Sequence, residues 1–325
     1  MATKHQRAPA GGCARLSVVD ESVSTARASA GEQAEHARFG WEDWEWDSSL
    51  FDGSAGYYRR GRIPYAEGLA GSLAEVLGLD GRGRLLDVGC GPGVIALRLA
   101  HLFDHVIGLD PDADMLDQAR RAAGQRGSTN ASWVRLRAEE LPAGMGTFRV
   151  ITFAQSFHWM DRPKVASAVG SMLEPGGAVV QIDPGRDGIA AGHAPTGPYP
   201  AAPFAAIDSL RRAYLGPDRR AGQGFRNTSP SGEDEIFQAA GFLPETCVSV
   251  ADDRILDRST DDLVAWVFSA SSTAPHLFGE GLRRFEADLR EVLVDASPSG
   301  HFSVPLTATT IRIRRLPGTE SPRDA

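Results

Sequence analysis

Cysteine is scarce in this sequence, and long apolar runs are absent. The 325 residues include three cysteines, Cys13, Cys90 and Cys247, which lie far apart. An odd number at such spacings makes neither a disulfide framework nor a CxxC metal pair, and it is typical of a reducing compartment, here the cytoplasm. No run approaches the roughly 18 apolar residues that a membrane helix needs. We therefore expect no bound metal and no membrane partner.

Positive charge is also in deficit. The chain has 34 Lys and Arg residues against 42 Asp and Glu residues, a formal net charge of -8. A mildly acidic protein is a poor candidate for non-specific binding to nucleic acid, because like charges repel. The composition, 42% hydrophobic and 23% charged, is that of a globular protein. The length predicts one or two domains with a sizeable core.

The N-terminal part of the chain divides into two segments. Residues 1–38 are rich in Ala, Gly, Ser and Arg without an apolar period, which predicts a disordered or loosely packed arm. Residues 39–66 instead gather eight aromatic residues: Phe39, Trp41, Trp44, Trp46, Phe51, Tyr57, Tyr58 and Tyr65. Two interpretations stay open, a segment packed on the domain edge and a lid over a ligand. Such a cluster is also a candidate interface for a homodimer or hetero-complex.

Residues 67–183 alternate between short apolar strands and helices. We expect strands at 84–88, 105–109, 133–136, 149–153 and 178–182, and helices at 94–103, 115–123 and 164–172. This alternation predicts βαβ units, hence an α/β, doubly wound parallel sheet with helices on both faces.

The remaining third of the chain is less regular. Segment 184–232 is crowded with Gly and Pro around a helix expected at 204–215, and we interpret it as a substrate cap insertion. Segment 233–315, with helices at 234–241, 260–270 and 279–294 and strands at 245–251 and 302–313, is expected to complete the sheet. Residues 316–325 are expected to be a disordered tail. Arginines 211, 212, 219, 220 and 226 in the insertion indicate either recognition of an anionic substrate or a solvated surface.

The most informative stretch runs from Leu85 to Gly93. An apolar strand ends near Asp87, and glycines follow at positions 89, 91 and 93 before a helix begins at Val94. Glycine permits positive φ and lets a ligand lie against the backbone, and open α/β sheets bind ligands at the carboxyl ends of their strands. A second acid, Asp110, ends the next strand, where a carboxylate accepts hydrogen bonds from ribose hydroxyls.

A nicotinamide-dinucleotide domain is one alternative for this turn. Its fingerprint is GxGxxG. Here the third glycine arrives one residue early, and Val94 occupies the expected position. That interpretation also leaves Glu139 and the segment from Gln155 to Trp159 without a role.

Five motifs in order resemble those of class I S-adenosylmethionine (SAM)-dependent methyltransferases. They are Asp87-Val88-Gly89-Cys90-Gly91-Pro92-Gly93, Gly108-Leu109-Asp110-Pro111, Ala138-Glu139-Glu140-Leu141-Pro142, Gln155-Ser156-Phe157-His158-Trp159-Met160-Asp161 and Leu173-Glu174-Pro175-Gly176-Gly177. The sequence is most similar to the small-molecule group that includes trans-aconitate methyltransferase-like enzymes. The resemblance implies a Rossmann-like sheet of seven strands, mostly parallel, whose antiparallel seventh strand suits residues 302–313.

The resemblance also implies cofactor-binding roles for matching positions. The backbone of Gly89, Gly91 and Gly93 would face the methionine part of SAM, and Asp87 would orient its amino group. Asp110 would hold the ribose hydroxyls. The other implied contacts are the adenine with Ala138 (backbone) and Glu139 (side chain), the adenosine with Pro111 and Met115, and the sulfonium end with Ala154 and Gln155. Tyr58 and Arg59 lie before the first core helix, where two interpretations stay open: they cover the methionine end of SAM or its carboxylate, or they are packing or solvent-exposed residues.

The chemistry implied is methyl transfer from SAM, with S-adenosylhomocysteine (SAH) as product, to the O, N or C atom of a small molecule in specialised metabolism. A hydroxyl or ammonium acceptor needs a base, and His158 is the best candidate, although it also suits a purely structural role. His193 and His276 are weaker candidates. A carboxylate acceptor needs no base. Two alternatives stay open: other SAM-assisted or cyclisation chemistry on the same fold, and a non-catalytic partner subunit.

Overall fold

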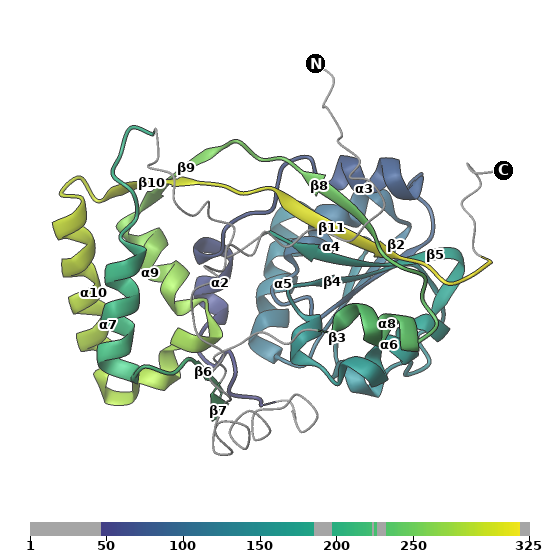
Figure 1. Ribbon diagram of the computed structural model, residues 1–325, viewed down its shortest axis with the longest axis horizontal. Helices are drawn as coiled ribbons and strands as arrows, with labels where there is room; N and C mark the ends of the chain where they lie inside the picture. The colour runs from purple at the N-terminus through teal and green to yellow at the C-terminus, as the bar shows by residue number, and fades with distance from the viewer. Residues whose placement is uncertain (1–46, 185–196, 223, 226–231, 319–325) are drawn as a thin grey trace, which may run out of the picture.

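The computed structural model describes residues 47–184, 197–222, 224–225 and 232–318. The predicted arm 1–38, the first four aromatics of segment 39–66, His193 and most of the predicted tail lie outside these residues. The described chain folds into two lobes, a larger one built on the main sheet and a smaller, mostly helical one beside it (Figure 1).

A sheet of seven strands forms the centre of the larger lobe, in the order β3-β2-β1-β4-β5-β11-β8. The strands are β1 (Arg84–Val88), β2 (His105–Asp110), β3 (Ala131–Arg135), β4 (Phe148–Ala154), β5 (Leu173–Asp183), β8 (Thr246–Val250) and β11 (Thr309–Arg314). Strands β1 to β5 pair in parallel, whereas β11 runs antiparallel to both β5 and β8. The predicted fold class, a doubly wound and mostly parallel sheet of seven strands, is confirmed.

Helices cover both faces of this sheet, because its central strands are apolar on both sides. Helices α3 (Leu69–Leu77), α4 (Val94–Leu99) and α5 (Ala113–Arg126) lie on one face, and α6 (Arg162–Ser171) and α8 (Glu233–Ala239) lie on the other. Leu85 packs in a buried cluster with Leu73 and Ile95. Its neighbour Leu86 packs in another cluster with Val165 and Phe237. Successive side chains of a strand point to opposite faces, so β1 contributes to both cores.

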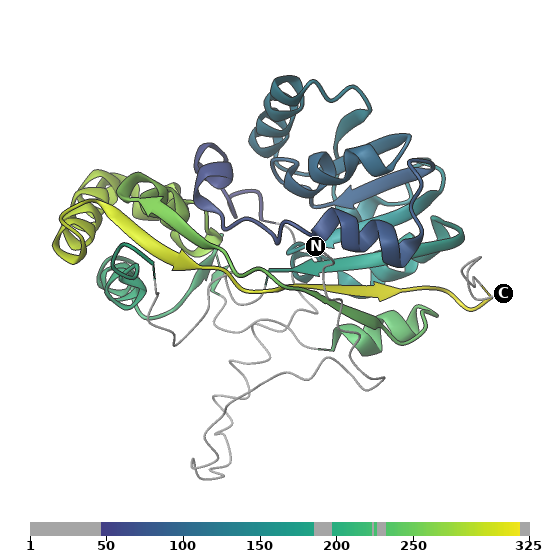
Figure 2. The same cartoon turned by 90° about the horizontal axis from the view of Figure 1, so that it is seen from above.

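The smaller lobe is assembled from distant parts of the chain (Figures 1 and 2). Its helices are α2 (Ala55–Gly61), α7 (Phe204–Leu215), α9 (Thr260–Phe268) and α10 (Leu282–Ala296), with the short turns η5 (Ser271–Thr273) and η6 (Pro275–Gly281). The strands β9 (Ile255–Ser259) and β10 (His301–Pro305) pair antiparallel, and the short β6 (Arg220–Ala221) and β7 (Gly224–Phe225) form a further pair. Phe268, Phe278 and Phe285 lie in its buried core, where Phe278 and Phe285 stack with ring centroids 4.0 Å apart.

One expectation for the C-terminal third needs correction. The single strand expected at 302–313 is two strands in different sheets, because β10 ends at Pro305 and pairs with β9, whereas β11 enters the main sheet. Proline cannot donate to a ladder, so it sits where a strand ends. Segment 233–315 adds β8 and β11 to the main sheet, and the chain between these two strands builds much of the smaller lobe.

Helix α2 is fastened to the smaller lobe by close packing and by one buried arginine. A Cβ added at Gly61 would lie 2.2 Å from the carbonyl oxygen of Ala265 on α9, so only glycine permits this approach. Arg258 donates from Nη2 to the carbonyls of Arg60 and Gly61, at 2.8 Å each. These contacts satisfy carbonyls that the helix end leaves without partners, so the position of α2 is set by the smaller lobe.

No described helix has the length and the apolar character needed to cross a membrane. The described residues also contain no cluster of three or more His, Cys, Asp or Glu side chains arranged to hold a metal ion.

Candidate functional site

The glycine turn after β1 forms one wall of a cavity at the carboxyl edge of the sheet. Strand β1 lies between β2 and β4, where the strand order reverses, which is the place where doubly wound sheets bind ligands. Gly89 and Gly91 have φ of 67° and 51°. A Cβ at Gly89 would lie 2.6 Å from the Ser156 side chain, whereas one at Gly91 would meet nothing within 4 Å. The backbone at Gly91 is therefore open to a ligand.

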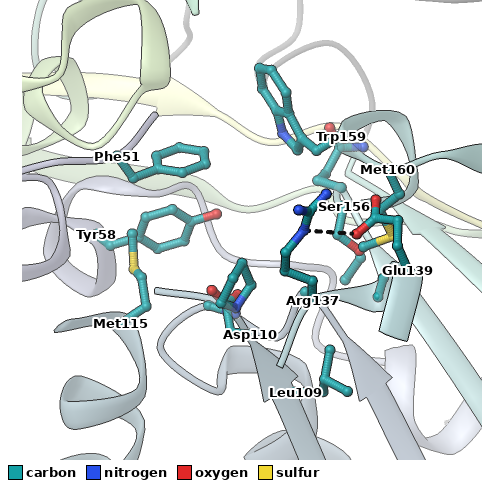
Figure 3. A pocket seen from close by; sticks show the side chains of 16 residues that line it. Phe51, Tyr58, Leu109, Asp110, Met115, Arg137, Glu139, Ser156, Trp159 and Met160 are labelled. Atoms are coloured by element: carbon teal, nitrogen blue, oxygen red, sulfur yellow. Dashed lines mark hydrogen bonds and ion pairs between the residues drawn. The ribbon is translucent and has the colours of Figure 1, made fainter. Parts of the chain in front are cut away.

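Asp110 lies at the end of β2 and forms the floor of the same cavity (Figure 3). Its side chain accepts hydrogen bonds from the backbone N–H of Gly91 at 2.8 Å and of Asp112 at 2.9 Å. Burial nevertheless raises its pKa to about 7, and the two donors offset this only in part. A buried carboxyl with free lone pairs is suited to accept hydrogen bonds from ligand hydroxyls.

Asp87 is buried deeper, at the end of β1. Its carboxylate accepts from the hydroxyl of Thr152 at 2.7 Å and from the backbone N–H of Ala96 at 3.1 Å, which joins β4 and α4 to the turn. Burial raises the pKa of Asp87 to about 6. It borders a groove next to the cavity, so it holds the turn in shape and presents its remaining lone pairs to a ligand.

The far wall of the cavity comes from η3 (Ala138–Glu140) and from the start of α5. Asp112 caps α5 by accepting from the N–H of Asp114 and Met115, and this places Met115 beside the cavity. Glu139 also borders the cavity, but its carboxylate accepts from the N–H of Asp161 at 2.9 Å and pairs with Arg137 at 3.4 Å. Both Glu139 oxygens therefore already have protein partners, as the dashed line in Figure 3 shows for Arg137.

Three aromatic rings from different parts of the chain close the cavity. Phe51 makes edge contacts with Tyr58, at a centroid distance of 6.3 Å, and with Trp159, at 6.1 Å. Trp159 belongs to η4 (Phe157–Trp159) of the larger lobe, whereas Tyr58 belongs to α2. In Figure 3 the three rings lie along the same side of the cavity, above Asp110. Of the two interpretations of the aromatic segment, this arrangement favours the lid.

A groove of about 410 Å³ adjoins the cavity and runs between the two lobes. The residues bordering both compartments are Tyr58, Gly89, Gly91, Ala154 and Gln155. Gln155 follows β4 with φ of 57°, an uncommon value for a residue other than glycine. Such outliers cluster at ligand sites, and this one presents Gln155 at the junction of the cavity and the groove.

Most of the residues expected at the cofactor site lie around these two compartments. Those bordering the cavity are Tyr58, Gly89, Gly91, Asp110, Pro111, Met115, Ala138, Glu139, Ala154 and Gln155, and Asp87 borders the groove. Gly93 borders neither compartment. It packs against the Trp133 ring, since a Cβ at Gly93 would lie 2.5 Å from a ring carbon of Trp133. Its role is in packing.

The histidines expected to act as bases lie elsewhere. His158 borders neither compartment and packs beside Trp159, with ring centroids 5.0 Å apart. Its role as a base stays a prediction. The Nδ1 atom of His276 lies 3.2 Å from the carbonyl oxygen of Asp52, also outside both compartments.

Several cavity residues were not expected from the sequence. They are Phe51, Leu109, Arg137, Ser156, Trp159 and Met160. Most of them are sequence neighbours of residues that were expected at the site, and this proximity was the one available signal. The sequence does not show which of these neighbours has a side chain that turns into the cavity. Phe51 lies far from the motifs, and its place depends on the docking of α2.

The two compartments suit the cofactor implied by the motifs. The cavity is mostly apolar, has one buried carboxyl at Asp110, and is open at Gly91. An adenosine has a flat apolar base and two ribose hydroxyls, which match the rings and the carboxyl. The groove begins at Gly89 and Gln155, where the rest of the cofactor has room.

Comparison with known proteins agrees with this fit. A family described as "Methyltransferase domain" matches residues 85–177. The uncharacterized methyltransferase Rv3342 of Mycobacterium tuberculosis is 33% identical over 142 residues, 43% of this chain and 55% of that protein. The malonyl-[acyl-carrier protein] O-methyltransferase of Legionella pneumophila is 35% identical over 80 residues, 23% of this chain and 27% of that protein.

Solved structures are similar at lower identity. The YcgJ protein of Bacillus subtilis is 20% identical, with a TM-score of 0.44 over 77% of this chain and 98% of that chain. The [4+2]-cyclase SpnF is 19% identical, with a TM-score of 0.47 over 83% of this chain and 95% of that chain.

The chain spans about half the length of the first curated relatives it matches, 55% of each. The family match covers the segment from β1 to β5, which carries the glycine turn, Asp110 and Gln155. The finer resemblance to trans-aconitate methyltransferase-like enzymes stays a prediction. The sheet order and the family match identify a class I methyltransferase domain in this chain, of the family whose methyl donor is SAM.

Proposed function

We propose that this protein is a SAM-dependent methyltransferase that methylates an O, N or C atom of a small molecule, as a cytoplasmic enzyme of specialised metabolism. The observation that carries the proposal is the cavity between the Gly91 turn and the buried Asp110, with Gln155 at its exit. Two relatives whose names state an acceptor atom are O-methyltransferases, of malonyl-[acyl-carrier protein] and in ubiquinone biosynthesis. Oxygen is therefore the first acceptor atom to test.

The protein contributes binding, orientation and exclusion of water. SAM, when bound, supplies a methyl group activated on a sulfonium. Asp110 would hold the ribose, the backbone at Gly89 and Gly91 would face the methionine part, and the three rings would shield the adenosine from water. Gln155 would stand beside the sulfonium end. Positioning of this kind is worth up to roughly 7–11 kcal/mol when reacting atoms are well aligned.

Calorimetric titration with SAH tests cofactor binding directly. We expect binding to the wild-type protein. In Asp110→Ala we expect affinity lower by about 10-fold to 100-fold, because hydrogen bonds to a charged group contribute about 1.5–3 kcal/mol. Asp295→Ala, at an exposed position of α10 outside both compartments, is the control. Absence of SAH binding to wild type would end the proposal.

Other SAM-assisted chemistry on this fold, including cyclisation, is the second candidate, because a cofactor pocket survives a change of reaction. Mass spectrometry separates the two. A product heavier by one methyl group, formed together with SAH, establishes methyl transfer. A product of unchanged mass without SAH establishes the alternative.

A non-catalytic partner subunit is the third candidate, with the aromatic segment 39–66 as the surface for a homodimer or hetero-complex. Light scattering with and without residues 1–46 tests it. A wild-type assembly that dissociates on truncation supports this role, and an unchanged monomer contradicts it.

A further inference from the structure

The groove between the lobes has a strongly positive lining. Its arginines are Arg59 and Arg62 from α2 and the chain after it, Arg98 from α4, and Arg126 from the end of α5. The two lobes thus face each other across the groove with guanidinium groups on both sides. We call this compartment the arginine groove.

Negative charge in the lining is almost absent. Asp87 is the one carboxylate among the residues that border the groove. It is 1% exposed, and Thr152 and Ala96 already donate to it. Four guanidiniums and one buried carboxylate border the groove, and burial raises the pKa of that carboxyl to about 6. Glu67 and Asp252, outside the lining, offset part of the charge of Arg98. The groove carries an excess of positive charge.

Two of the arginines are held by the backbone. Arg98 donates to the carbonyls of Tyr65, Ala66 and Glu67, which fastens the chain after α2 to α4. Arg62 donates to the carbonyl of Ser269 and lies over the Tyr58 ring, but its buried Nε has no hydrogen-bond partner among the described residues. Carbonyl partners satisfy hydrogen bonds without neutralising charge.

The side chains of the other two arginines, Arg59 and Arg126, have no hydrogen-bond or ion-pair partner among the described residues. They come from opposite lobes and are close enough to repel each other: the pKa of Arg59 is lowered by burial and then by Arg126. Both residues are solvent-exposed, so water screens their mutual repulsion, and an anion that enters the groove can reach both guanidinium groups.

The arginines of the insertion make a useful contrast. Arg211 donates to Asp208 and to the carbonyls of Gly216 and Asp218, and Arg212 pairs with the same Asp208. Their hydrogen bonds are satisfied within the smaller lobe, and neither of these two arginines borders the groove.

The cofactor alone does not neutralise the groove. SAM has one carboxylate, but it also has an ammonium and a sulfonium, so it adds positive charge overall. If one guanidinium takes the methionine carboxylate, unpaired guanidiniums remain. Apolar side chains of Ile63, Val94 and Ile95 also border the groove. The lining therefore suits a molecule with an apolar body and an anionic end.

We propose that the arginine groove binds the anionic end of the acceptor substrate, a carboxylate or a phosphate, between Arg59 and Arg126. This inference rests on the proposed function, because it assigns the ligand of the groove to the acceptor of the methyl group. Guanidinium groups bind both oxyanions through paired hydrogen bonds. Binding energy from this end would position the reacting atom near Gln155.

Three probes with the same alkyl chain test the groove by calorimetry with saturating SAH: n-hexanoate, n-hexyl phosphate and neutral hexanamide. We expect at least one anion to bind about tenfold more tightly than hexanamide, because a charge-assisted hydrogen bond contributes about 1.5–3 kcal/mol. The tighter of the two anions identifies the oxyanion. In the Arg59→Gln/Arg126→Gln double variant, we expect this preference to disappear. In the single Arg126→Gln variant, whose side chain has no assigned role at the cofactor, we expect the preference to weaken while SAH affinity stays within about twofold.

The matched control is the Arg121→Gln/Arg283→Gln double variant, which removes two positive charges from exposed positions of α5 and α10 outside the groove. It should leave all three affinities unchanged. Equal wild-type affinity for the three probes would overturn the inference. An Arg126→Gln variant that loses SAH affinity would also overturn it, because Arg126 would then hold the cofactor. If SAH does not bind at all, the proposed function fails, and titration of the probes alone still tests the groove.

Discussion

At the scale of single residues, Asp110 has the sharpest chemical consequence. Its pKa is raised to about 7, mainly by burial, so in the absence of ligand it changes charge near neutral pH. A folded pKa above the unfolded value means that the folded state holds the proton more tightly. The contribution of Asp110 to the free energy of unfolding is fully present below about pH 4 and is lost as the pH rises through about 7.

Cofactor binding should have the opposite pH dependence. Hydroxyl donors favour the ionised carboxylate, so we expect SAH affinity at about pH 6 to be about tenfold lower than at about pH 8, with proton release on binding. Titration in buffers of different ionisation enthalpy measures both effects. In Asp110→Asn the affinity should be low, and only a smaller pH dependence from Asp87, whose pKa is about 6, should remain over this range. A flat wild-type profile would contradict the assignment.

His158 gives a second test at this scale. If it is the base, His158→Asn should lower kcat by about 10²-fold to 10⁴-fold and remove an ionisation near neutral pH from the pH-rate profile. If it is structural, the profile should keep its shape and only thermal stability should change. A carboxylate that itself accepts the methyl group needs no base, because it is already ionised.

At the scale of elements, helix α2 supplies residues to both the cavity and the groove. Its outer face provides Tyr58 to the cavity and Arg59 to the groove, while Gly61 packs against α9. A small displacement of α2 would therefore move the lid and one side of the groove together.

Two glycines of α2 allow a matched comparison. Gly61→Ala should destabilise the protein by about 1–3 kcal/mol, because the new Cβ would lie 2.2 Å from the Ala265 carbonyl. Gly56→Ala meets nothing within 4 Å and should stabilise by about 0.5–1 kcal/mol. Urea unfolding measures both. Equal effects of the two substitutions would show that α2 is not packed as described.

The sequence predicts some elements much better than others. Strands β1 to β5 and their helices follow from local apolar periodicity, and the motif positions follow from strand ends. The β9–β10 pair escaped prediction because it joins residues 255–259 to residues 301–305, with two helices between them. The inward turn of Phe51 and the four-arginine lining likewise depend on contacts between lobes, which no local pattern encodes.

At the scale of the whole molecule, the cofactor site belongs to both lobes. The matched segment 85–177 includes Asp110 and Trp159 but lacks Phe51 and Tyr58. Cofactor binding should therefore fasten the smaller lobe to the larger one.

Hydrogen exchange can measure this coupling. With saturating SAH, amide exchange in α2 and α9 should slow, because Arg258 and Gly61 couple α2 to α9. Helix α10, which borders neither compartment, should change little. Slowing confined to the larger lobe would show that the rings of the lid do not engage the cofactor.

The way the chain passes between the lobes limits how they can move. Residues 62–68 cross from α2 to α3, residues 251–254 from β8 to β9, and residues 306–308 from β10 to β11. Two lobes joined by one segment can rotate freely about it. Three short connecting segments side by side oppose a twist of one lobe against the other, so the motion they permit is bending. Bending of this kind would widen or narrow the groove between the lobes, so it would change access to Arg59 and Arg126 together.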